Sequence, residues 1–420
     1  MLDILRSVLR FRRFETDPVA RRLQRIANIS DLRLAAKKRL PAGVFDYIDG
    51  GADDEITLRR NTTAFSDITF RPRVLRDVSG GETSTTILGK PAAAPLILAP
   101  TGFCRIADPA GELAVSRAAA AAGIPYALST LATRSLEEIK LAQQSVSPPL
   151  GFSAPRRWFQ VYVWKDRDLL QELLHRAERS GVDTIVITVD TAVLGRRERD
   201  VRRGFTLPPK IGLDTIVQGA LHPRWTTRFV TSEPIRFANV TGSAAPDGTD
   251  AISLSDHVNS QFDQRLSWDD ITWFRDRWSG HIVLKGIQTV ADARVAATHG
   301  VDAIALSNHG GRQLDGAPAP IDLVRPVAEA LGGSIEIFCD GGVRRGSDIL
   351  KALSLGATAC FVGRPYLYGL AVAGERGVEW VIDFLCDGLL QSMALSGIVA
   401  PDQATSELIA FGAVDNQRQR

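Results

Sequence analysis

Short apolar runs alternate with longer amphipathic stretches over most of the chain, and this alternation constrains the fold more than any other feature. Runs of four to six mostly apolar residues are typical of strands that are buried on both faces of a parallel sheet. They are Pro95–Ala99, Tyr126–Ser129, Trp158–Val163, Thr184–Val189, Ile282–Lys285, Ala303–Leu306, Ile335–Cys339 and Ala359–Val362. Helical candidates lie between them, at Gly111–Ala122, Ser135–Gln143, Asp168–Ser180, Trp268–Trp278, Thr289–His299, Ile321–Leu331 and Gly346–Leu355. Eight strands with intervening helices predict an α/β fold of the (β/α)8 TIM-barrel type, with a doubly wound open sheet as the alternative.

The composition is typical of a soluble globular protein, since 45% of the 420 residues are hydrophobic and 23% are charged. A formal net charge of +2 gives no electrostatic reason to expect nucleic acid as a partner. The four cysteines are widely spaced and form no CxxC pair, which favours buried thiols in a reducing compartment. No apolar run approaches the ~18 residues needed to cross a bilayer, and we find no signal-peptide pattern. These features predict a cytoplasmic protein.

The ends of the chain differ from the body. Residues 1–28 form a basic arm in which seven arginines alternate with apolar residues. Such a segment is typical of a basic amphipathic element resting on anionic lipid. We favour a solvated arm packed on the body, because Asp3, Glu15 and Asp17 dilute the charge. We expect residues 29–409 to form one catalytic domain and residues 410–420 to form a tail.

One connection is much longer than the others. Between Asp190 and Trp268, at about residues 191–267, lies an insertion rich in Pro, Gly, Ser and Thr. Loops of this length after a barrel strand are normally functional or partly disordered. Within it, Ile211–Leu221 and Trp225–Val230 carry apolar and aromatic residues. They are candidates for a lid over the site, or for a surface that meets a membrane or another subunit.

Polar residues stand at all eight predicted strand ends, where barrel enzymes form their active sites. The first four ends carry Pro100, Thr101 and Gly102; Ser129; Gln160 and Tyr162; and Thr188 and Asp190. The last four carry Lys285; Ser307, His309 and Arg312; Asp340, Gly341, Gly342 and Arg344; and Gly363 and Arg364. Their convergence on one rim predicts a functional site there.

The last two strand ends have the composition of a phosphate site. Gly341, Gly342 and Gly363 allow backbone amides to approach an anion, and Arg344 and Arg364 supply guanidinium groups. The alternative is ordinary glycine turns with surface arginines. A lysine on an apolar strand, Lys285, either projects toward a ligand across the barrel mouth or is a paired ion of the core.

Of the six histidines, only His309 lies in a glycine-flanked loop at a strand end. Its neighbour Arg312 is suited to two-pronged binding of a carboxylate. Asp190, at another strand end, is suited to orient the imidazole and stabilise its protonated form. We therefore predict a general base at His309. We predict no metal site, because the sequence contains no HExxH motif, EF-hand loop or Cys/His cluster.

These residues resemble the family of FMN-dependent L-2-hydroxy acid oxidases and dehydrogenases, especially its quinone-linked L-lactate dehydrogenases and mandelate dehydrogenases. The resemblance covers about residues 29–409. It is carried by Ser307–Asp315 (SNHGGRQLD), Asp340–Gly346 (DGGVRRG), Phe159–Tyr162 (FQVY), Thr188–Asp190 (TVD) and Leu40–Ala52 (LPAGVFDYIDGGA). The last of these matches the family's N-terminal lid, which implies that Tyr47 enters the substrate pocket.

The resemblance implies FMN as cofactor and assigns a role to each candidate. Pro100, Thr101, Gly102, Ser129, Gln160 and Thr188 are expected around the flavin ring, with Lys285 at its pyrimidine end. Ser307, Asp340, Gly341, Gly342, Arg344, Gly363 and Arg364 complete the cofactor site and hold its phosphate. Arg312 and Arg197 are expected to clamp the substrate carboxylate, with hydrogen bonds from Tyr47 and Tyr162. His309 is then the base, and Asp190 stabilises its imidazolium.

The same resemblance implies oxidation of a 2-hydroxy acid to a 2-oxo acid. Gly102 stands where the oxidases of the family resemble one another in carrying alanine, which favours a quinone or another non-oxygen acceptor. Leu131 replaces a bulky tryptophan of glycolate oxidase-like members and suits L-lactate, whereas His222–Trp225 resembles the mandelate branch. A homotetramer and a peripheral membrane contact through Arg202–Arg265 are further expectations. The alternatives are a hydrogen peroxide-forming oxidase, a flavin-dependent isomerase, a non-flavin phosphate-binding barrel enzyme and a non-catalytic scaffold.

Overall fold

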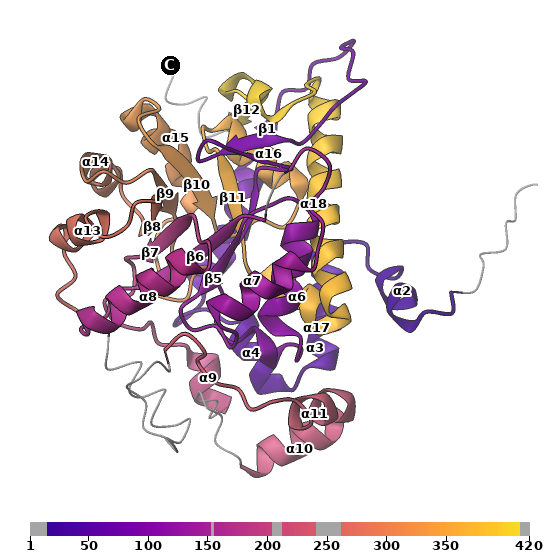
Figure 1. Ribbon diagram of the computed structural model, residues 1–420. Helices are drawn as coiled ribbons and strands as arrows, with labels where there is room; N and C mark the ends of the chain where they lie inside the picture. The colour runs from indigo at the N-terminus through magenta and orange to yellow at the C-terminus, as the bar shows by residue number, and fades with distance from the viewer. Residues whose placement is uncertain (1–14, 153–154, 204–211, 241–261, 412–420) are drawn as a thin grey trace, which may run out of the picture.

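A closed barrel of eight parallel strands forms the centre of the protein (Figure 1). The structure is a computed structural model that describes residues 15–152, 155–203, 212–240 and 262–411. Around the barrel the strands follow the order β10-β11-β4-β5-β6-β7-β8-β9. Their bounds are β4 Leu96–Leu98, β5 Tyr126–Ser129, β6 Arg157–Tyr162, β7 Thr184–Thr188, β8 His281–Ile287, β9 Ala303–Leu306, β10 Glu336–Asp340 and β11 Ala359–Val362. The closed barrel confirms the predicted fold and excludes the open sheet.

Side chains fill the interior of the barrel, so it is a core and not a channel. Trp158, Phe338 and Phe361 come from β6, β10 and β11, and their ring centroids lie 5.8 to 6.0 Å apart. Small and branched residues of the other strands complete this inner cluster. Because side chains alternate along a strand, the interior row of β6 continues from Trp158 to Gln160 and Tyr162. The packed rings therefore leave room for a ligand only beyond them, at the carboxyl ends of the strands.

Helices cover the outside of the barrel, and the seven predicted helices are present with shifts of no more than one residue at every end but one. They are α6 Gly111–Ala121, α7 Leu136–Gln144, α8 Arg167–Arg179, α13 Trp268–Arg275, α14 Val290–Thr298, α15 Pro320–Leu331 and α16 Gly346–Ser354. The largest difference is α13, which ends three residues before the predicted end at Trp278. Two further helices, α17 Arg364–Ala373 and α18 Glu375–Ser396, follow β11.

The N-terminal segment packs against the barrel and reaches its mouth. Its elements are α2 Pro18–Leu23, α3 Ile29–Arg39, α4 Ala42–Asp49, α5 Ile56–Thr63 and η1 Ala64–Asp67. Tyr47 lies on α4, which confirms the predicted helical lid. Half of the basic arm, residues 1–14, lies outside the described residues. In its described half, Asp17 pairs with Arg376 of α18.

Short peripheral elements complete the fold. The pairs β1 Ile68–Phe70 with β12 Ile409–Phe411, and β2 Thr85–Ile87 with β3 Lys90–Ala92, are antiparallel. Three 3-10 turns lie at η2 Cys104–Ile106, η3 Pro401–Gln403 and η4 Ser406–Leu408. Strand β12 extends two residues beyond the expected domain boundary at residue 409.

The insertion after β7 contains α9 Glu198–Arg203, α10 Leu213–Leu221 and α11 Pro223–Val230. Figure 1 shows α10 and α11 together beside α3 and α4, and a hydrogen bond of 3.1 Å from the Ala42 amide to Gln218 Oε1 joins the two groups. Residues 204–211 and 241–261 of the insertion lie outside the described residues. Among the described residues, no helix is both long and apolar enough to span a membrane.

Candidate active site

A cavity of about 530 Å³ opens at the carboxyl ends of the strands. It is lined by all but two of the predicted site residues: Tyr47, Pro100, Thr101, Gly102, Ser129, Gln160, Tyr162, Thr188, Arg197, Lys285, His309, Arg312, Asp340, Gly341, Gly342, Arg344, Gly363 and Arg364. The other two, Asp190 and Ser307, lie behind this lining and bond to residues within it. Residues far apart in the sequence thus meet at one rim.

His309 and Asp190 form a hydrogen-bonded pair. The Asp190 Oδ1 atom lies 2.9 Å from His309 Nδ1, and the Asp190 side chain is only 2% exposed. Gly286 makes room for this carboxylate, since a Cβ there would come within 2.7 Å of the Asp190 Cβ. With Nδ1–H donating to Asp190, the neutral imidazole keeps its lone pair on Nε2. The pair therefore has the arrangement of an oriented general base.

The His309 loop is fixed from the N-terminal segment. His309 has a φ of 56°, a left-handed conformation that is uncommon outside glycine. The preceding Asn308 forms two reciprocal amide hydrogen bonds with Asn61 of α5, at 2.8 and 2.7 Å, and also accepts from the Gly311 amide at 3.0 Å. Sequence analysis assigned no role to either asparagine. Asn308 lies within the SNHGGRQLD motif, but nothing in the sequence identifies Asn61 as its partner.

Lys285, Ser307 and Asp340 form a buried polar triad at the floor of the cavity. Lys285 Nζ lies 2.8 Å from both Ser307 Oγ and Asp340 Oδ2, and Ser307 Oγ donates to Asp340 Oδ2 at 2.7 Å. Burial lowers the pKa of Lys285, but the carboxylates of Asp340 and Asp190 outweigh this effect and raise the pKa above its ordinary value. Lys285 therefore stays positively charged at the floor of the cavity, paired with the Asp340 carboxylate.

Neutral hydrogen-bonding groups lie across the next three strands. Gln160 of β6 donates through Nε2 to Thr188 Oγ1 at 2.9 Å and accepts at Oε1 from Ser129 Oγ at 3.2 Å. All three side chains are buried. These groups suit the polar edge of a flat heterocyclic ring, which needs both donors and acceptors along one side.

The opposite end of the cavity has the features of an anion site. Gly341 and Gly342 have φ values of 86° and 92°, which only glycine adopts readily. Arg344 lines this end, and Arg364, the first residue of α17, stands where the helix N-terminus attracts negative charge. Arg364 is also structural, because its guanidinium donates to the carbonyl oxygens of Ile48, Gly310 and Gly50 at 3.1, 2.9 and 2.7 Å.

Two guanidinium groups lie close to the Tyr47 ring above the His309 loop. The Cζ atoms of Arg312 and Arg197 are 5.1 and 5.4 Å from the ring centroid. Arg312 also donates to the Tyr47 carbonyl oxygen at 2.7 Å. Burial, reinforced by the positive charge of Arg197, lowers the pKa of Arg312 to about 9. Such crowded cations favour a carboxylate ligand, which would offset their repulsion.

Asp200 is a cavity residue that sequence analysis did not identify. It lines the cavity from α9, and its Oδ2 lies 3.1 Å from Arg197 Nε. Burial raises the pKa of Asp200, although Arg197 opposes this shift. The carboxylate thus holds Arg197 beside the cavity. The only signal in the sequence is the spacing of the two residues on one turn of a short charged helix.

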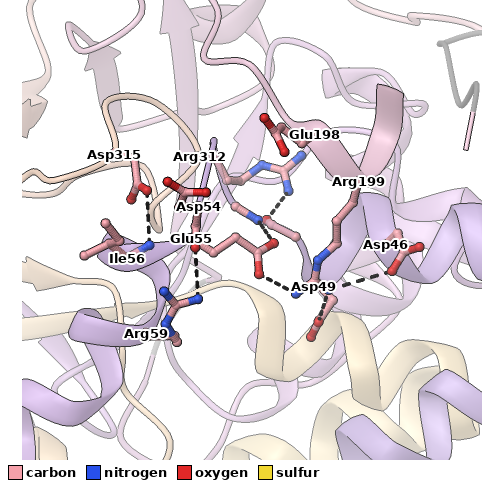
Figure 2. A network of polar contacts seen from close by, with 12 residues as sticks. Asp46, Asp49, Asp54, Glu55, Ile56, Arg59, Glu198, Arg199, Arg312 and Asp315 are labelled. Carbon is pink, nitrogen blue, oxygen red and sulfur yellow. Dashed lines mark hydrogen bonds and ion pairs between the residues drawn. The ribbon is translucent and has the colours of Figure 1, made fainter. Parts of the chain in front are cut away.

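Helix α9 is tied to the N-terminal lid by a network of ion pairs (Figure 2). Figure 2 shows Arg199 extending from α9 toward the carboxylates of α4 and toward Glu55. Arg199 lies 2.9 Å from Asp49 and 2.5 Å from Glu55. Burial alone would raise the pKa of Asp49, but hydrogen bonds from Arg33 and Tyr368 outweigh it and lower the pKa to about 2. The network fixes Tyr47 and Arg197 relative to each other.

Apolar and aromatic side chains form the remaining wall. Phe237 packs edge-on against Phe103 at 4.6 Å between centroids, and Phe262 packs edge-on against Tyr162 at 5.0 Å. Hydrogen bonds hold both segments to the barrel side: the Ala238 amide donates to the Ala132 carbonyl at 3.3 Å, and the Asp263 amide donates to the Val163 carbonyl at 3.2 Å. Sequence analysis missed both phenylalanines, because they lie in the aperiodic insertion.

FMN fits the residues that are present. A cavity of about 530 Å³ is in the usual range for a cofactor site. Its glycine-rich cationic end suits a phosphate, and its buried amide and hydroxyl groups suit a polar ring. In the described ranges we find no group of three or more His, Cys, Asp or Glu side chains arranged to hold a metal ion.

Comparisons with known proteins agree with this geometry. The model of the family described as FMN-dependent dehydrogenase matches residues 36–411. The chain is 44% identical over 399 residues to a Mycobacterium tuberculosis protein named "Putative L-lactate dehydrogenase", covering 95% of this chain and 92% of that one. It is 42% identical over 372 residues to glycolate oxidase of Spinacia oleracea, covering 89% and 92%. The crystal structure of the monotopic membrane protein (S)-mandelate dehydrogenase superposes with a TM-score of 0.86 at 36% identity, covering 92% of this chain and all of that one.

Proposed function

Because the chain belongs to the FMN-dependent dehydrogenase family, we propose that it oxidises an L-2-hydroxy acid to the 2-oxo acid with His309 as general base. The observation that carries the proposal is that His309, oriented by its hydrogen bond to Asp190, lines one cavity together with Arg197 and Arg312. A flavin isomerase, a non-flavin lyase or a scaffold has no need of this combination of an oriented base with two carboxylate-binding groups.

FMN supplies the two-electron acceptor when it is bound. In our proposal the phosphate is held by the backbone of Gly341 and Gly342 with Arg344 and Arg364, and the ring by Ser129, Gln160 and Thr188. Pro100, Thr101, Gly102 and Gly363 contribute the remaining contacts. Lys285, held in place by Ser307 and Asp340, offsets negative charge at the ring's polar edge. These assignments rest on the positions of the residues around the cavity.

The other residues bind the substrate and move its proton. Arg312 and Arg197 hold the carboxylate, and the hydroxyl groups of Tyr47 and Tyr162 complete its hydrogen bonds. Nε2 of His309 takes the proton, and the Asp190 carboxylate, 2.9 Å from Nδ1, stabilises the imidazolium that forms. The buried Lys285 keeps its charge throughout, because its pKa is raised.

We propose L-lactate as the substrate and mandelate as the second candidate. Leu131, which lines the cavity, leaves space for a methyl group, and the relative with 44% identity bears the name of an L-lactate dehydrogenase. The aromatic wall of Phe103, Phe237 and Phe262 favours mandelate instead, since it suits a phenyl ring. The likeness to (S)-mandelate dehydrogenase supports the same alternative.

The test is anaerobic stopped-flow mixing of the FMN-loaded protein with L-lactate, (S)-mandelate, glycolate and longer L-2-hydroxy acids. We expect the flavin absorbance to bleach fastest with L-lactate. Fastest bleaching by (S)-mandelate selects the second candidate. If none of these acids bleached the flavin while dithionite did, the proposed reaction would be wrong.

For the electron acceptor we propose a quinone or another non-oxygen acceptor. A Cβ at Gly102 would lie 3.1 Å from both the Cβ and the carbonyl oxygen of Leu131, so alanine here requires Leu131 to shift. We expect the reduced protein to react faster with a soluble quinone than with oxygen, and Gly102→Ala to change that ratio. Faster reoxidation by oxygen in the unaltered protein would favour a hydrogen peroxide-forming oxidase.

We also propose a peripheral membrane contact and a homotetramer. The membrane contact is supported by the exposed Ile216, Val217 and Leu221 of α10 and Val230 of α11. Equal sedimentation with lipid vesicles by the intact protein and by a form lacking residues 202–265 would contradict it. Light scattering tests the tetramer, and a monomeric mass would contradict it.

A further inference from the structure

A second cavity, of about 280 Å³, lies on the flank of the molecule. It is bounded by the end of α3, the loop that follows η2, the start of α11 and Ala371 of α17. It shares no lining residue with the cavity that contains His309. The mechanism proposed above therefore assigns it no role.

Positive charge dominates the lining of this flank cavity. Lys38, Arg39, Arg224 and Arg228 supply four cations, and Asp108 is the only carboxylate among the described residues that line it. Asp108 is fully engaged by Arg228, whose NH1 and NH2 atoms lie 2.5 and 3.0 Å from its two oxygens. The lining thus keeps a surplus of three positive charges that Asp108 does not balance.

Capping of a helix explains part of this cluster but not all of it. Arg39 donates through Nε to the Ala371 carbonyl at 3.0 Å, and Arg22 donates to the Val372 carbonyl. Both bonds satisfy carbonyl groups at the C-terminal end of α17, where cations are stabilising. Lys38 and Arg224 make no such contact among the hydrogen bonds of the described ranges, and both are exposed.

The cations are close enough to repel one another. Burial lowers the pKa of Arg39, and the positive charges of Arg22, Arg224 and Arg228 lower it further. Like charges gathered around a half-buried arginine are unfavourable unless an anion joins them. The electrostatics of the flank cavity therefore favour a multiply charged anion.

The elements that form the walls of the flank cavity are anchored to the rest of the protein. Trp225 Nε1 donates to the Ile106 carbonyl at 2.8 Å and stacks on Phe229 with centroids 4.7 Å apart. The Ala42 amide donates to Gln218 Oε1 at 3.1 Å. These contacts anchor α10 and α11 to the barrel side, and Figure 1 shows the pair beside α3 and α4.

We propose that the flank cavity binds a phosphate group, either as a free phosphate or as the headgroup of an anionic lipid. Arginine forks match the oxygens of phosphate, and a dianion balances most of the surplus charge, whereas a single carboxylate balances one charge. The start of α11, at His222 and Pro223, adds a helix N-terminus to the same lining. Leu221 on the rim is 67% exposed, which suits a phosphate with an apolar substituent.

The first test is calorimetric titration of the full-length, FMN-loaded protein with inorganic phosphate, against chloride at the same ionic strength. We expect Arg224→Gln to weaken phosphate binding by a factor of about ten, the effect of losing one charge-assisted hydrogen bond. Arg236→Gln is the matched control, since it removes the same charge from an exposed position of the same insertion outside the cavity. Absence of binding, or equal weakening by both variants, would overturn the proposal.

The second test identifies the source of the phosphate. Vesicles of phosphatidylcholine with phosphatidylglycerol are compared with phosphatidylcholine alone, for the unaltered protein, Arg224→Gln and Arg236→Gln. The cavity is assigned to a lipid headgroup if the anionic vesicles retain the protein, if Arg224→Gln but not Arg236→Gln reduces this retention, and if inorganic phosphate competes with it. Calorimetric binding without such retention assigns it to a free phosphate. Because the flavin reaction does not enter either test, failure of this proposal leaves the proposed reaction intact.

Discussion

The two halves of the active-site cavity are built differently. The barrel half consists of buried residues on the strands or directly after them, which bond to one another: Ser129, Gln160, Thr188, Lys285, Ser307 and Asp340. The outer half consists of side chains from α4, α9 and the rest of the insertion: Tyr47, Arg197, Asp200, Phe237 and Phe262. Strands fix the positions of the first set, whereas ion pairs and aromatic packing hold the second. The barrel half is therefore suited to invariant chemistry, and the outer half to the choice of substrate.

The largest effect is expected at His309, whose loop belongs to the barrel half. His309→Ala should slow anaerobic flavin reduction by about three orders of magnitude, because it removes the general base. If the barrel half serves the chemistry and not the choice of substrate, the rate of flavin reduction falls by a similar factor for L-lactate and (S)-mandelate. The absorption spectrum should show that flavin is still bound. Reduction within a few-fold of the unaltered protein would contradict the assignment of the base. Asp190→Asn should slow flavin reduction less than His309→Ala does, because His309 Nδ1–H can still donate a hydrogen bond to the asparagine side chain.

The next effect concerns the network that anchors the outer half. Asp49→Asn should lower the free energy of unfolding by about 3 kcal/mol, because Arg33 loses its carboxylate partner and Arg199 keeps only Glu55 and Asp46. The pKa of Asp49 is lowered to about 2, so this stabilisation is present above the ordinary carboxyl pKa and is lost as the pH falls toward 2. Denaturant titration at neutral and acidic pH measures both effects.

The matched control is the exposed pair of Arg60 and Asp67, whose side chains are 42% and 58% exposed. Asp67→Asn should change the free energy of unfolding by less than about 1 kcal/mol, because solvent screens such pairs. Equal effects of the two substitutions would show that the network around Asp49 does not anchor the lid.

The dependence of kcat/KM on pH distinguishes Arg312, which binds the substrate carboxylate, from Lys285 of the barrel half. The pKa of Arg312 is lowered to about 9, so it binds a carboxylate below that pH and loses its charge above it. We expect kcat/KM to fall about tenfold per pH unit above pH 9, with kcat falling only at higher pH because bound carboxylate retains the proton. Lys285, with its raised pKa, keeps its charge over this range.

Arg312→Lys sharpens this prediction. Lysine has a lower intrinsic pKa than arginine, and the same burial lowers it further. The fall in kcat/KM should therefore begin at a lower pH than in the unaltered protein. An unchanged profile would mean that another group controls carboxylate binding.

The smallest effect is expected in the aromatic wall. Phe237→Ala and Phe262→Ala should change the ratio of kcat/KM for (S)-mandelate to that for L-lactate by about tenfold, since a pocket contact with a hydrophobic group contributes 1–3 kcal/mol. The rate with L-lactate should change little. If both substrates slowed equally, the wall would serve the structure of the site and not the choice of substrate.

The barrel half could be predicted because its residues follow a local rule. Gln160 stands two residues after Trp158, and Lys285 stands two after Val283, so the alternation of strand side chains carries both from the interior to the rim. The apolar runs that indicate the strands also locate the polar residues at their ends. The same sequence pattern therefore predicts both the barrel fold and the polar residues at its rim.

The outer half depends on contacts between distant parts of the chain. Phe237 and Phe262 lie in a stretch without periodicity. Asp200 lies on a six-residue helix and affects the cavity through its ion pair with Arg197. Helix α17 was missed for a related reason: Pro365–Val372 is buried at every position, so it shows no amphipathic pattern. Only the assembled structure shows what these residues contact.

The reciprocal amide pair of Asn61 and Asn308 has a consequence for biosynthesis. The two residues are separated by 247 positions, so the loop that carries the base acquires its second anchor only after most of the polypeptide has been made. A nascent barrel still awaiting its sixth strand therefore holds an early asparagine without its partner. The amide pair therefore ties the loop that carries the base to an early segment of the polypeptide while the last two barrel strands are still to be made.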